Sequence, residues 1–147
     1  MTKRMIVAGL ALAGIFVALY LFLYKIGVVG NLSCSIGSCE TVNLSRWALF
    51  LGAPVAAWGV GFYVVMFILA VASLQDRYAD STGIAKIITG ASGIGFVFTV
   101  WLTYLELFVI NAICQWCVIS ALLVTTMFAF SMADLRERTT PVSELPE

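Results

Sequence analysis

Residues 87–132 form a long, almost uninterrupted apolar run and read IITGASGIGFVFTVWLTYLELFVI, then NA, then ICQWCVISALLVTTMFAFSM. Glu106 is its single charge, and a helix needs about 20 mostly apolar residues to cross a bilayer. This stretch has room for two spans, and two more apolar windows precede it. The sequence therefore predicts an all-α membrane protein, a bundle of four transmembrane helices with a long outer loop between helices 1 and 2. The four windows are residues 5–24, about 49–74, about 87–110 and about 113–132.

The composition agrees with a membrane protein and excludes several kinds of function. Of the 147 residues, 62% are hydrophobic and 11% are charged, a balance far more apolar than that of soluble domains. The absence of histidine excludes a Ser-His-Asp or Cys-His catalytic site and the common histidine-containing zinc sites. Eight basic and eight acidic residues give a net charge of zero, so nothing favours nucleic acid as a partner. Any chemistry must come from carboxylates, hydroxyls or the four cysteines.

Basic residues predict the direction in which the helices cross, because lysine and arginine gather in the cytoplasmic loops of membrane proteins. With four spans, six basic residues fall on the side of both termini and two fall on the other. The six are Lys3, Arg4, Arg77, Lys86, Arg136 and Arg138, and the two are Lys25 and Arg46. We therefore expect a multi-pass protein of the plasma membrane, the inner membrane of a bacterium, with both termini in the cytoplasm. Residues 1–133 would form the membrane redox domain, and residues 134–147 a loosely ordered polar cytoplasmic tail.

The four cysteines form two pairs, and this topology puts both pairs on the outward side. Cys34 and Cys39 lie in the outer loop, while Cys114 and Cys117 open the fourth window as a C-x-x-C motif on one face of a helical turn. With Asn111 as the expected N-cap, the start of this helix favours a thiolate at Cys114. A thiolate is the species that attacks a disulfide, and compartments outside the cytoplasm keep disulfides formed.

Three interpretations of the cysteines remain open from the residues alone. In the first, an exposed pair exchanges electrons with a membrane-embedded pair, which passes them to a lipid-soluble two-electron acceptor such as a quinone. In the second, a loop disulfide staples a non-enzymatic membrane subunit or scaffold, and the helical cysteines only pack. In the third, four cysteines hold zinc. The spacing lacks the usual two C-x2-C knuckles, so no metal site is expected.

Taken in order, these motifs resemble the vitamin K epoxide reductase family in its short bacterial form. The resemblance covers about residues 5–133 and rests on the two loop cysteines, Ser45-Arg46-Trp47 after them, Trp58-Gly59 in the second span, and the C-x-x-C motif that opens the last. It implies a quinone-dependent thiol-disulfide oxidoreductase that uses menaquinone or ubiquinone and supports disulfide formation in exported proteins. It also implies an extracytoplasmic thioredoxin-fold dithiol protein as a separate partner.

The resemblance implies a role for each cysteine. Cys34 resembles the residue that meets the partner protein, Cys39 the residue that exchanges with Cys114, and Cys117 the residue that faces the quinone. Four residues are candidates for the quinone site. They are Ser45, which resembles a family serine near the quinone-side cysteines, the aromatic residues Trp58 and Trp116, and Glu106.

The sequence departs from the vertebrate enzymes at two positions. Val55 stands where those enzymes place an asparagine that hydrogen-bonds the quinone, and Ala121 where they place a tyrosine. Without these donors the chain lacks groups that would bind and protonate an epoxide. Reduction of a quinone needs less, because the quinone ring is already electrophilic.

Glu106 is the one carboxylate inside a predicted span. Charged residues within a membrane are candidates for function, and Glu106 could supply protons to a reduced quinone. The alternative is that the third helix ends a turn early and leaves Glu106 in water.

Overall fold

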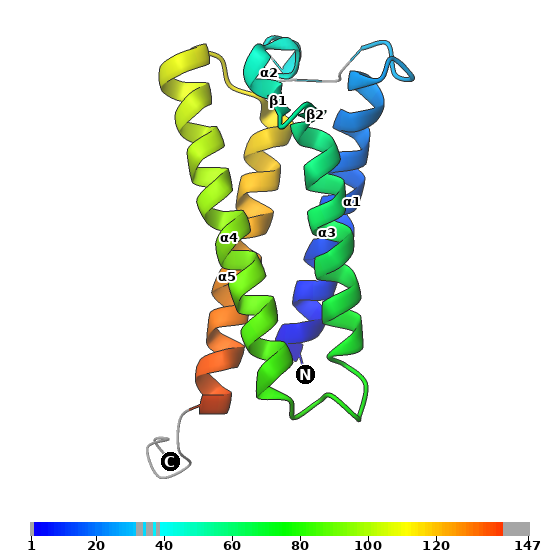
Figure 1. Cartoon of the computed structure of the whole chain (residues 1–147), viewed down its shortest axis with the longest axis vertical. Helices are drawn as coiled ribbons and strands as arrows, with labels where there is room; N and C mark the ends of the chain where they lie inside the picture. Colours follow the sequence, from blue (N-terminus) through cyan, green and yellow to red (C-terminus); the bar gives the residue numbers. More distant parts are fainter. Residues whose placement is uncertain (1, 32–33, 35–36, 38, 140–147) are drawn as a thin grey trace.

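The computed structural model describes residues 2–31, 34, 37 and 39–139, and it contains four helices long and apolar enough to cross a membrane (Figure 1). These are α1 (Thr2–Lys25), α3 (Val55–Ala72), α4 (Thr82–Tyr104), which continues into the π-helical segment η2 (Leu105–Ile110), and α5 (Gln115–Thr139). The predicted four-helix membrane bundle is confirmed.

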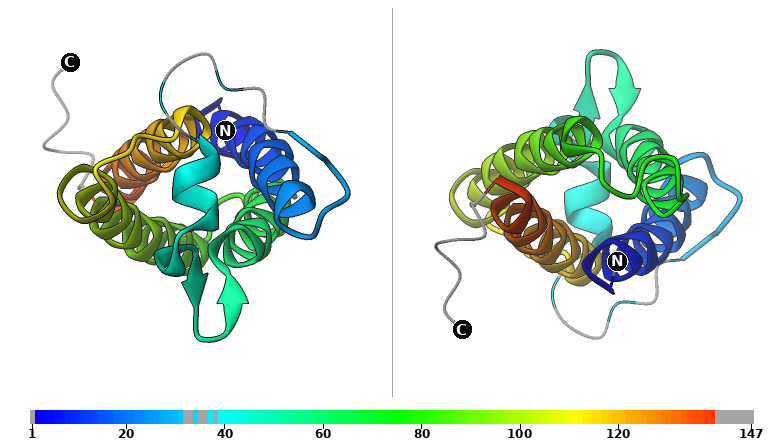
Figure 2. Two further views of the ribbon diagram at one scale, coloured as in Figure 1. Left: turned by 90° about the horizontal axis from the view of Figure 1, so that it is seen from above. Right: turned by 90° about the horizontal axis from the view of Figure 1, so that it is seen from below.

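The four long helices form a ring in the order α1, α3, α4 and α5, and the short helix α2 (Cys39–Leu44) lies across one end of it (Figure 2). From α2 the chain passes through the 3-10 turn η1 (Arg46–Ala48) and a hairpin of β1 (Leu49–Phe50) and β2 (Ala53–Pro54) into α3. We call the end covered by α2 the cysteine end, and the end where α1 begins and α5 finishes the terminal end (Figure 1).

Small residues let the helices approach closely. The core between α1 and α3 contains Ala11, Ala18 and Ala70 together with Tyr63 and Met66 of α3. A Cβ atom at Gly14 would collide with the ring of Tyr63, so only glycine fits there. Without a hydrophobic effect between helices in lipid, such close packing supplies much of the attraction that holds a bundle together.

The second helix begins later than predicted. The apolar window was expected to be helical from about residue 49, but residues 49–54 form the β1–β2 hairpin. Leu51 and Gly52 at its tip have φ values of 53° and 81°, and a turn with two positive φ values suits a two-residue hairpin. Pro54 then precedes the first residue of α3. Proline has no backbone N–H, but an N–H at this position would have no partner within the helix, so no helical hydrogen bond is lost.

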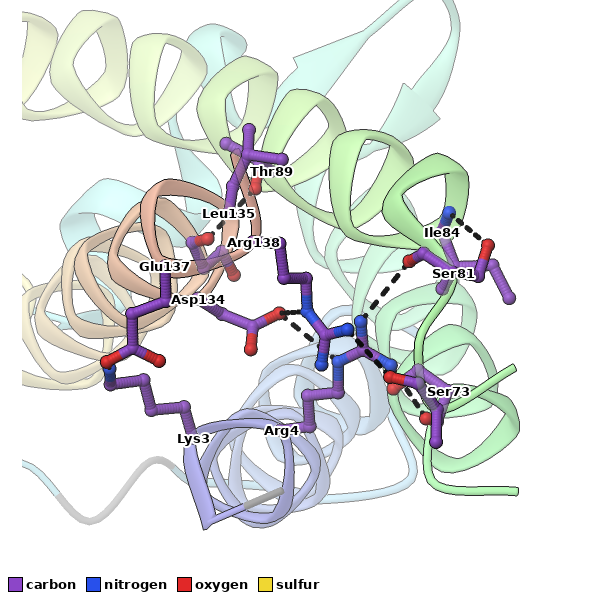
Figure 3. Close-up of polar contacts among 12 residues, drawn as sticks. Lys3, Arg4, Ser73, Ser81, Ile84, Thr89, Asp134, Leu135, Glu137 and Arg138 are labelled. Atoms are coloured by element: carbon purple, nitrogen blue, oxygen red, sulfur yellow. Dashed lines mark hydrogen bonds and ion pairs between the residues drawn. The ribbon is translucent and has the colours of Figure 1, made fainter. Parts of the chain in front are cut away.

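The fourth helix extends beyond its predicted end at Met132, because ion pairs fix its last turns at the terminal end (Figure 3). The Arg4 guanidinium is only 3% exposed and contacts Asp134 Oδ2 at 3.2 Å, and Arg138 contacts the same oxygen at 3.1 Å. Residues 134–139 are therefore helical rather than loosely ordered. The rest of the predicted tail, residues 140–147, lies outside the described residues.

Candidate functional site

All four cysteines lie at the cysteine end, in two chemical states. Cys34 and Cys39 are joined by a disulfide with their Cα atoms 6.2 Å apart, and Cys114 and Cys117 are free thiols. The two cysteines of each pair differ in their exposure to solvent. Cys39 at the start of α2 is 1% exposed and Cys114 is 0% exposed, whereas Cys34 and Cys117 are partly accessible.

The structure brings the two pairs together. Cys39 and Cys114 belong to one buried cluster, against which Cys34 and Cys117 pack. The backbones of Gly37 and Cys114 form an antiparallel β-bridge, so Gly37, which stands between the two loop cysteines in the sequence, lies directly on the segment that leads into α5. Gly37 has φ +83°, and a Cβ atom there would collide with the carbonyl oxygen of the residue before Cys114.

Cys114, and not Asn111, caps the N-terminus of α5. The Cys114 carbonyl accepts the Val118 N–H at 3.0 Å, and its Sγ accepts the Cys117 N–H at 3.3 Å, which is the bonding pattern of an N-cap. Asn111 has left-handed backbone angles (φ 56°, ψ 34°) and ends the preceding segment η2. The predicted cap was therefore wrong by three residues, and the sulfur itself takes the capping position.

This position affects the chemistry of Cys114. A hydrogen bond from the Cys117 side chain, supported by the Cys117 backbone N–H, lowers the pKa of Cys114 below the ordinary value, although burial acts in the opposite direction. The partial positive charge of a helix N-terminus also favours a thiolate. The expected thiolate-favouring site at Cys114 thus has a physical basis in the structure.

Asn43 makes a polar contact that the sequence did not predict. It lies one helical turn after Cys39 and is 8% exposed. Its Nδ2 donates to the Cys39 carbonyl oxygen at 2.8 Å and to Cys114 Sγ at 3.8 Å. A polar residue four positions after a cysteine is a weak signal. Nothing in the sequence indicates that this part of the loop is helical and turned toward α5.

Glu106 is buried and not exposed to solvent. The third long helix continues through Ile110 as η2, and Glu106 within it is 7% exposed. Its Oε2 accepts the Cys114 N–H at 3.4 Å, and its side chain hydrogen-bonds the Cys117 side chain. The alternative in which the helix ends before Glu106 is wrong.

A cavity of about 310 Å³ lies inside the bundle next to the cysteines. Its wall is mostly apolar and includes rings such as Phe62 and Phe98. Polar residues that line it near the cysteine end include Lys25, Asn43, Ser45, Glu106 and Cys117. The volume is at the lower end of the range for small-molecule pockets, roughly 300–1,000 Å³, and an apolar wall with few polar groups is typical of them. The cavity therefore has the size and the lining of a site for a small apolar molecule beside Cys117.

The structure separates the predicted quinone-site residues into two groups. Ser45, Trp58 and Glu106 line the cavity, whereas Trp116 packs edge-on against Tyr20 with ring centroids 5.2 Å apart and is not among the lining residues that the structure describes. Ser45 Oγ donates to a carbonyl of α2 at 2.7 Å, and Trp58 Nε1 donates to a carbonyl of the hairpin at 2.9 Å.

The two departures from the vertebrate pattern also fall in this cavity. Val55 and Ala121 both contribute to its wall. The wall is thus apolar at the two positions where an amide and a phenol would otherwise stand.

Comparison with known protein families agrees with this architecture. The family model described as the vitamin K epoxide reductase family matches residues 5–132, which include all four cysteines and most of each long helix. Proteins of this family use quinones in general. With so much of its length matched, the chain belongs to the vitamin K epoxide reductase family and is accordingly a membrane thiol-disulfide oxidoreductase.

Proposed function

We propose that this protein reoxidises a thioredoxin-fold dithiol partner through its two cysteine pairs and passes the electrons to a quinone, menaquinone or ubiquinone. The reaction would support disulfide formation in exported proteins. One observation carries the proposal: a disulfide-bonded loop pair packs against a free dithiol, and Cys117 of that dithiol lines an apolar cavity.

The partner enters at Cys34. Its thiolate attacks Cys34 Sγ, which is the more accessible sulfur of the loop disulfide, and Cys39 leaves as a thiolate. A second partner thiol then displaces Cys34, so the partner leaves oxidised and the loop pair is reduced. Each exchange forms one S–S bond and breaks one, and its rate depends on the attacking thiolate and on access to the sulfur.

The loop pair next reduces the membrane pair. Cys39 thiolate attacks Cys114 Sγ of the Cys114–Cys117 disulfide, and Cys117 leaves as a thiolate at the cavity wall. Cys34 then attacks Cys39, which re-forms the loop disulfide and releases Cys114. The resulting arrangement, with the loop pair oxidised and the membrane pair reduced, is the one that the structure has.

The remaining site residues act around the cavity. A quinone bound there supplies a two-electron, two-proton acceptor. Cys117 lines the cavity, and the Glu106 carboxyl, which lines it too, hydrogen-bonds the Cys117 side chain and is the residue that exchanges protons there. Ser45 and Trp58 shape the wall on the side of α2 and the hairpin, and we assign Trp116 no contact with the bound ring.

We further propose that the cysteine end faces outward and the terminal end faces the cytoplasm. Six of the eight basic residues lie in segments at the terminal end, namely the start of α1, the α3–α4 connection, the first turns of α4 and the last turns of α5. An excess of basic residues on one side is typical of the cytoplasmic side of membrane proteins.

The relay is tested by trapping its intermediate. In Cys117→Ser no Cys114–Cys117 disulfide can form, so the Cys114 thiolate can reach the mixed disulfide only by attacking Cys39 of the loop disulfide, with Cys34 leaving as a thiolate. Without Cys117 to resolve it, this Cys39–Cys114 disulfide should accumulate. Trypsin cleavage at the exposed residues Arg77 or Lys86 would leave two fragments that separate on a gel only after reduction. The matched control, Cys117→Ser combined with Cys114→Ser, should give fragments that separate without reduction. A loop pair that stays joined as Cys34–Cys39 in every molecule of Cys117→Ser would refute the relay.

A further inference from the structure

The Asn43 side chain touches both cysteines that exchange in the relay. It belongs to α2, which begins at Cys39, and it projects from the same face one turn later. One Nδ2 group donates to the Cys39 carbonyl and to Cys114 Sγ. The amide therefore connects the loop pair to the membrane pair at the point where the mixed disulfide must form.

The position of this amide is fixed from two sides. The Cys39 carbonyl, 2.8 Å away, orients the Nδ2 group, and Lys25 at the end of α1 donates to the Asn43 carbonyl at 2.9 Å. A basic side chain on the last carbonyls of a helix favours that helix end, so Lys25 stabilises α2 where it carries Asn43. Because the residue is buried, few waters compete for its N–H groups.

A hydrogen bond from an amide N–H stabilises the Cys114 sulfur to different extents in the mixed disulfide and in the free thiolate. In the step Cys34-S⁻ + Cys39–Cys114 → Cys34–Cys39 + Cys114-S⁻, the S34–S39 bond forms, the S39–S114 bond breaks, and the electron pair goes to Cys114 Sγ. Hydrogen bonds to charged acceptors are stronger than those to neutral acceptors, so the amide stabilises the Cys114 thiolate more than the divalent sulfur. A better-stabilised leaving thiolate departs faster.

We propose, as an extension of the relay proposed above, that Asn43 is a catalytic residue of the exchange between the two cysteine pairs. It donates to Cys114 Sγ as that sulfur takes up the electron pair and thereby drives the mixed disulfide toward the loop disulfide. The Cys117 N–H is the second donor to the same sulfur. Asn43 donates to the sulfur from α2 rather than from α5, and its amide does not change its protonation state with pH.

The Cys117→Ser background isolates this step. Its two states differ only in the position of one disulfide, Cys34–Cys39 or Cys39–Cys114, so their ratio reports the stability of the Cys114 thiolate. Asn43→Leu removes the donor at similar volume and should raise the ratio of linked to unlinked protein about tenfold, the lower end of the effect of a hydrogen bond to a charged group. The matched control is Thr41→Val, an exposed position on α2, which should leave the ratio unchanged.

A second variant covers the case in which Asn43→Leu does not fold. Asn43→Asp keeps the shape but places a carboxylate beside Cys114, so it should favour the link at least as strongly as Asn43→Leu does at pH values where the carboxyl is ionised. Titratable groups around this contact are Glu106 on η2, Tyr20, Tyr24 and Lys25 on α1, and Glu40 on α2. These groups are the same in all variants, so a difference in the ratio between the Asn43 variants is due to the side chain at position 43.

A second readout does not depend on the relay. In Cys117→Ser with the loop disulfide intact, Cys114 is the one free thiol, and the pH dependence of its alkylation by iodoacetamide gives its apparent pKa. Asn43→Leu should move that midpoint upward by about one pH unit, which is the same tenfold change in thiolate. If no Cys39–Cys114 disulfide forms even with Asn43 present, the proposed relay is refuted. The midpoint of Cys114 alkylation then tests by itself whether Asn43 stabilises the Cys114 thiolate. A folded Asn43→Leu protein with an unchanged midpoint and an unchanged ratio would overturn the proposal.

Discussion

Glu106 is the buried carboxyl at the junction of the membrane pair and the cavity. It accepts the Cys114 N–H, its side chain hydrogen-bonds Cys117, and it lines the cavity. A carboxyl inside a span is costly unless it is used or paired, and this one contacts both residues of the dithiol. Its place suits a proton donor to a reduced quinone and does not suit a surface charge.

Replacing this carboxyl should separate proton transfer from thiol exchange. Glu106→Gln keeps the hydrogen-bonding shape but cannot deliver a proton, so quinone reduction in proteoliposomes should fall about 100-fold, near the lower end of typical general acid–base effects. Oxidation of the partner by the loop disulfide should continue at the normal rate in a single turnover. The matched control, Glu40→Gln at an exposed site on α2, should behave as the unmodified protein. Unchanged quinone turnover in Glu106→Gln would end the proton-donor role.

At the residue scale, sequence alone singles out the candidates whose signal is local. The spacing of the two cysteine pairs and the isolated charge of Glu106 single these residues out without a structure. Asn43 could not be found in this way, because its meaning depends on a loop helix that brings its amide to Cys114. The N-cap was misplaced because Asn111 satisfies the composition rule for a cap but ends the previous segment instead.

Among the elements, the segment around Gly37 and the helix α2 determine whether the two pairs can meet. Gly37 forms a β-bridge with Cys114 and adopts a left-handed backbone that side chains other than glycine rarely take. It lies between the two loop cysteines in the sequence, so its bridge places that part of the chain against the segment that leads into α5. This contact lies outside the main core between the long helices, so we expect the bundle to fold without it.

Gly37→Ala should therefore impair exchange without unfolding the bundle. The added Cβ collides with a backbone oxygen and strains the positive φ, so the loop must move away from Cys114. We expect a drop of about tenfold or more in the rate at which the loop pair reduces the membrane pair, measured by rapid mixing with reduced partner. Thermal unfolding of the helices should change little. Gly30→Ala is the control, since nothing lies within 4 Å of an added Cβ there. Equal exchange rates in both variants would show that the bridge has no role.

Hydropathy predicted the long helices but not the small elements between them. Residues 49–54 are as apolar as the helix that follows, so composition alone did not separate the hairpin from α3. Gly52 and Pro54 are signals of a turn and of a helix start, and they would have placed the boundary more accurately. Helix α2 has six residues, too short for a periodic pattern, and it is held by the disulfide and by Lys25 rather than by its own propensity.

On the scale of the whole molecule, the two ends of the bundle differ in construction. At the terminal end, Arg4 joins α1 to Asp134 of α5 and to the Ser73 carbonyl at the end of α3, while Arg138 reaches the Ala79 carbonyl (Figure 3). At the cysteine end, contacts are made by a loop, a short helix and a hairpin over the cavity. In the sequence Arg4 is recognisable only as a basic residue that marks the cytoplasmic side of a span, because a partner 130 positions away cannot be identified from one sequence.

If the proposed relay operates, electrons from a dithiol leave this protein only through a quinone. The most direct measurement uses purified protein in liposomes, a reduced thioredoxin-fold dithiol and added menaquinone or ubiquinone, with partner oxidation and quinone absorbance followed together. The account predicts no multiple turnover without quinone, one quinol formed per partner disulfide when it is present, and loss of turnover in Cys117→Ser. Sustained oxidation of the partner without quinone, or with Cys117→Ser, would contradict it.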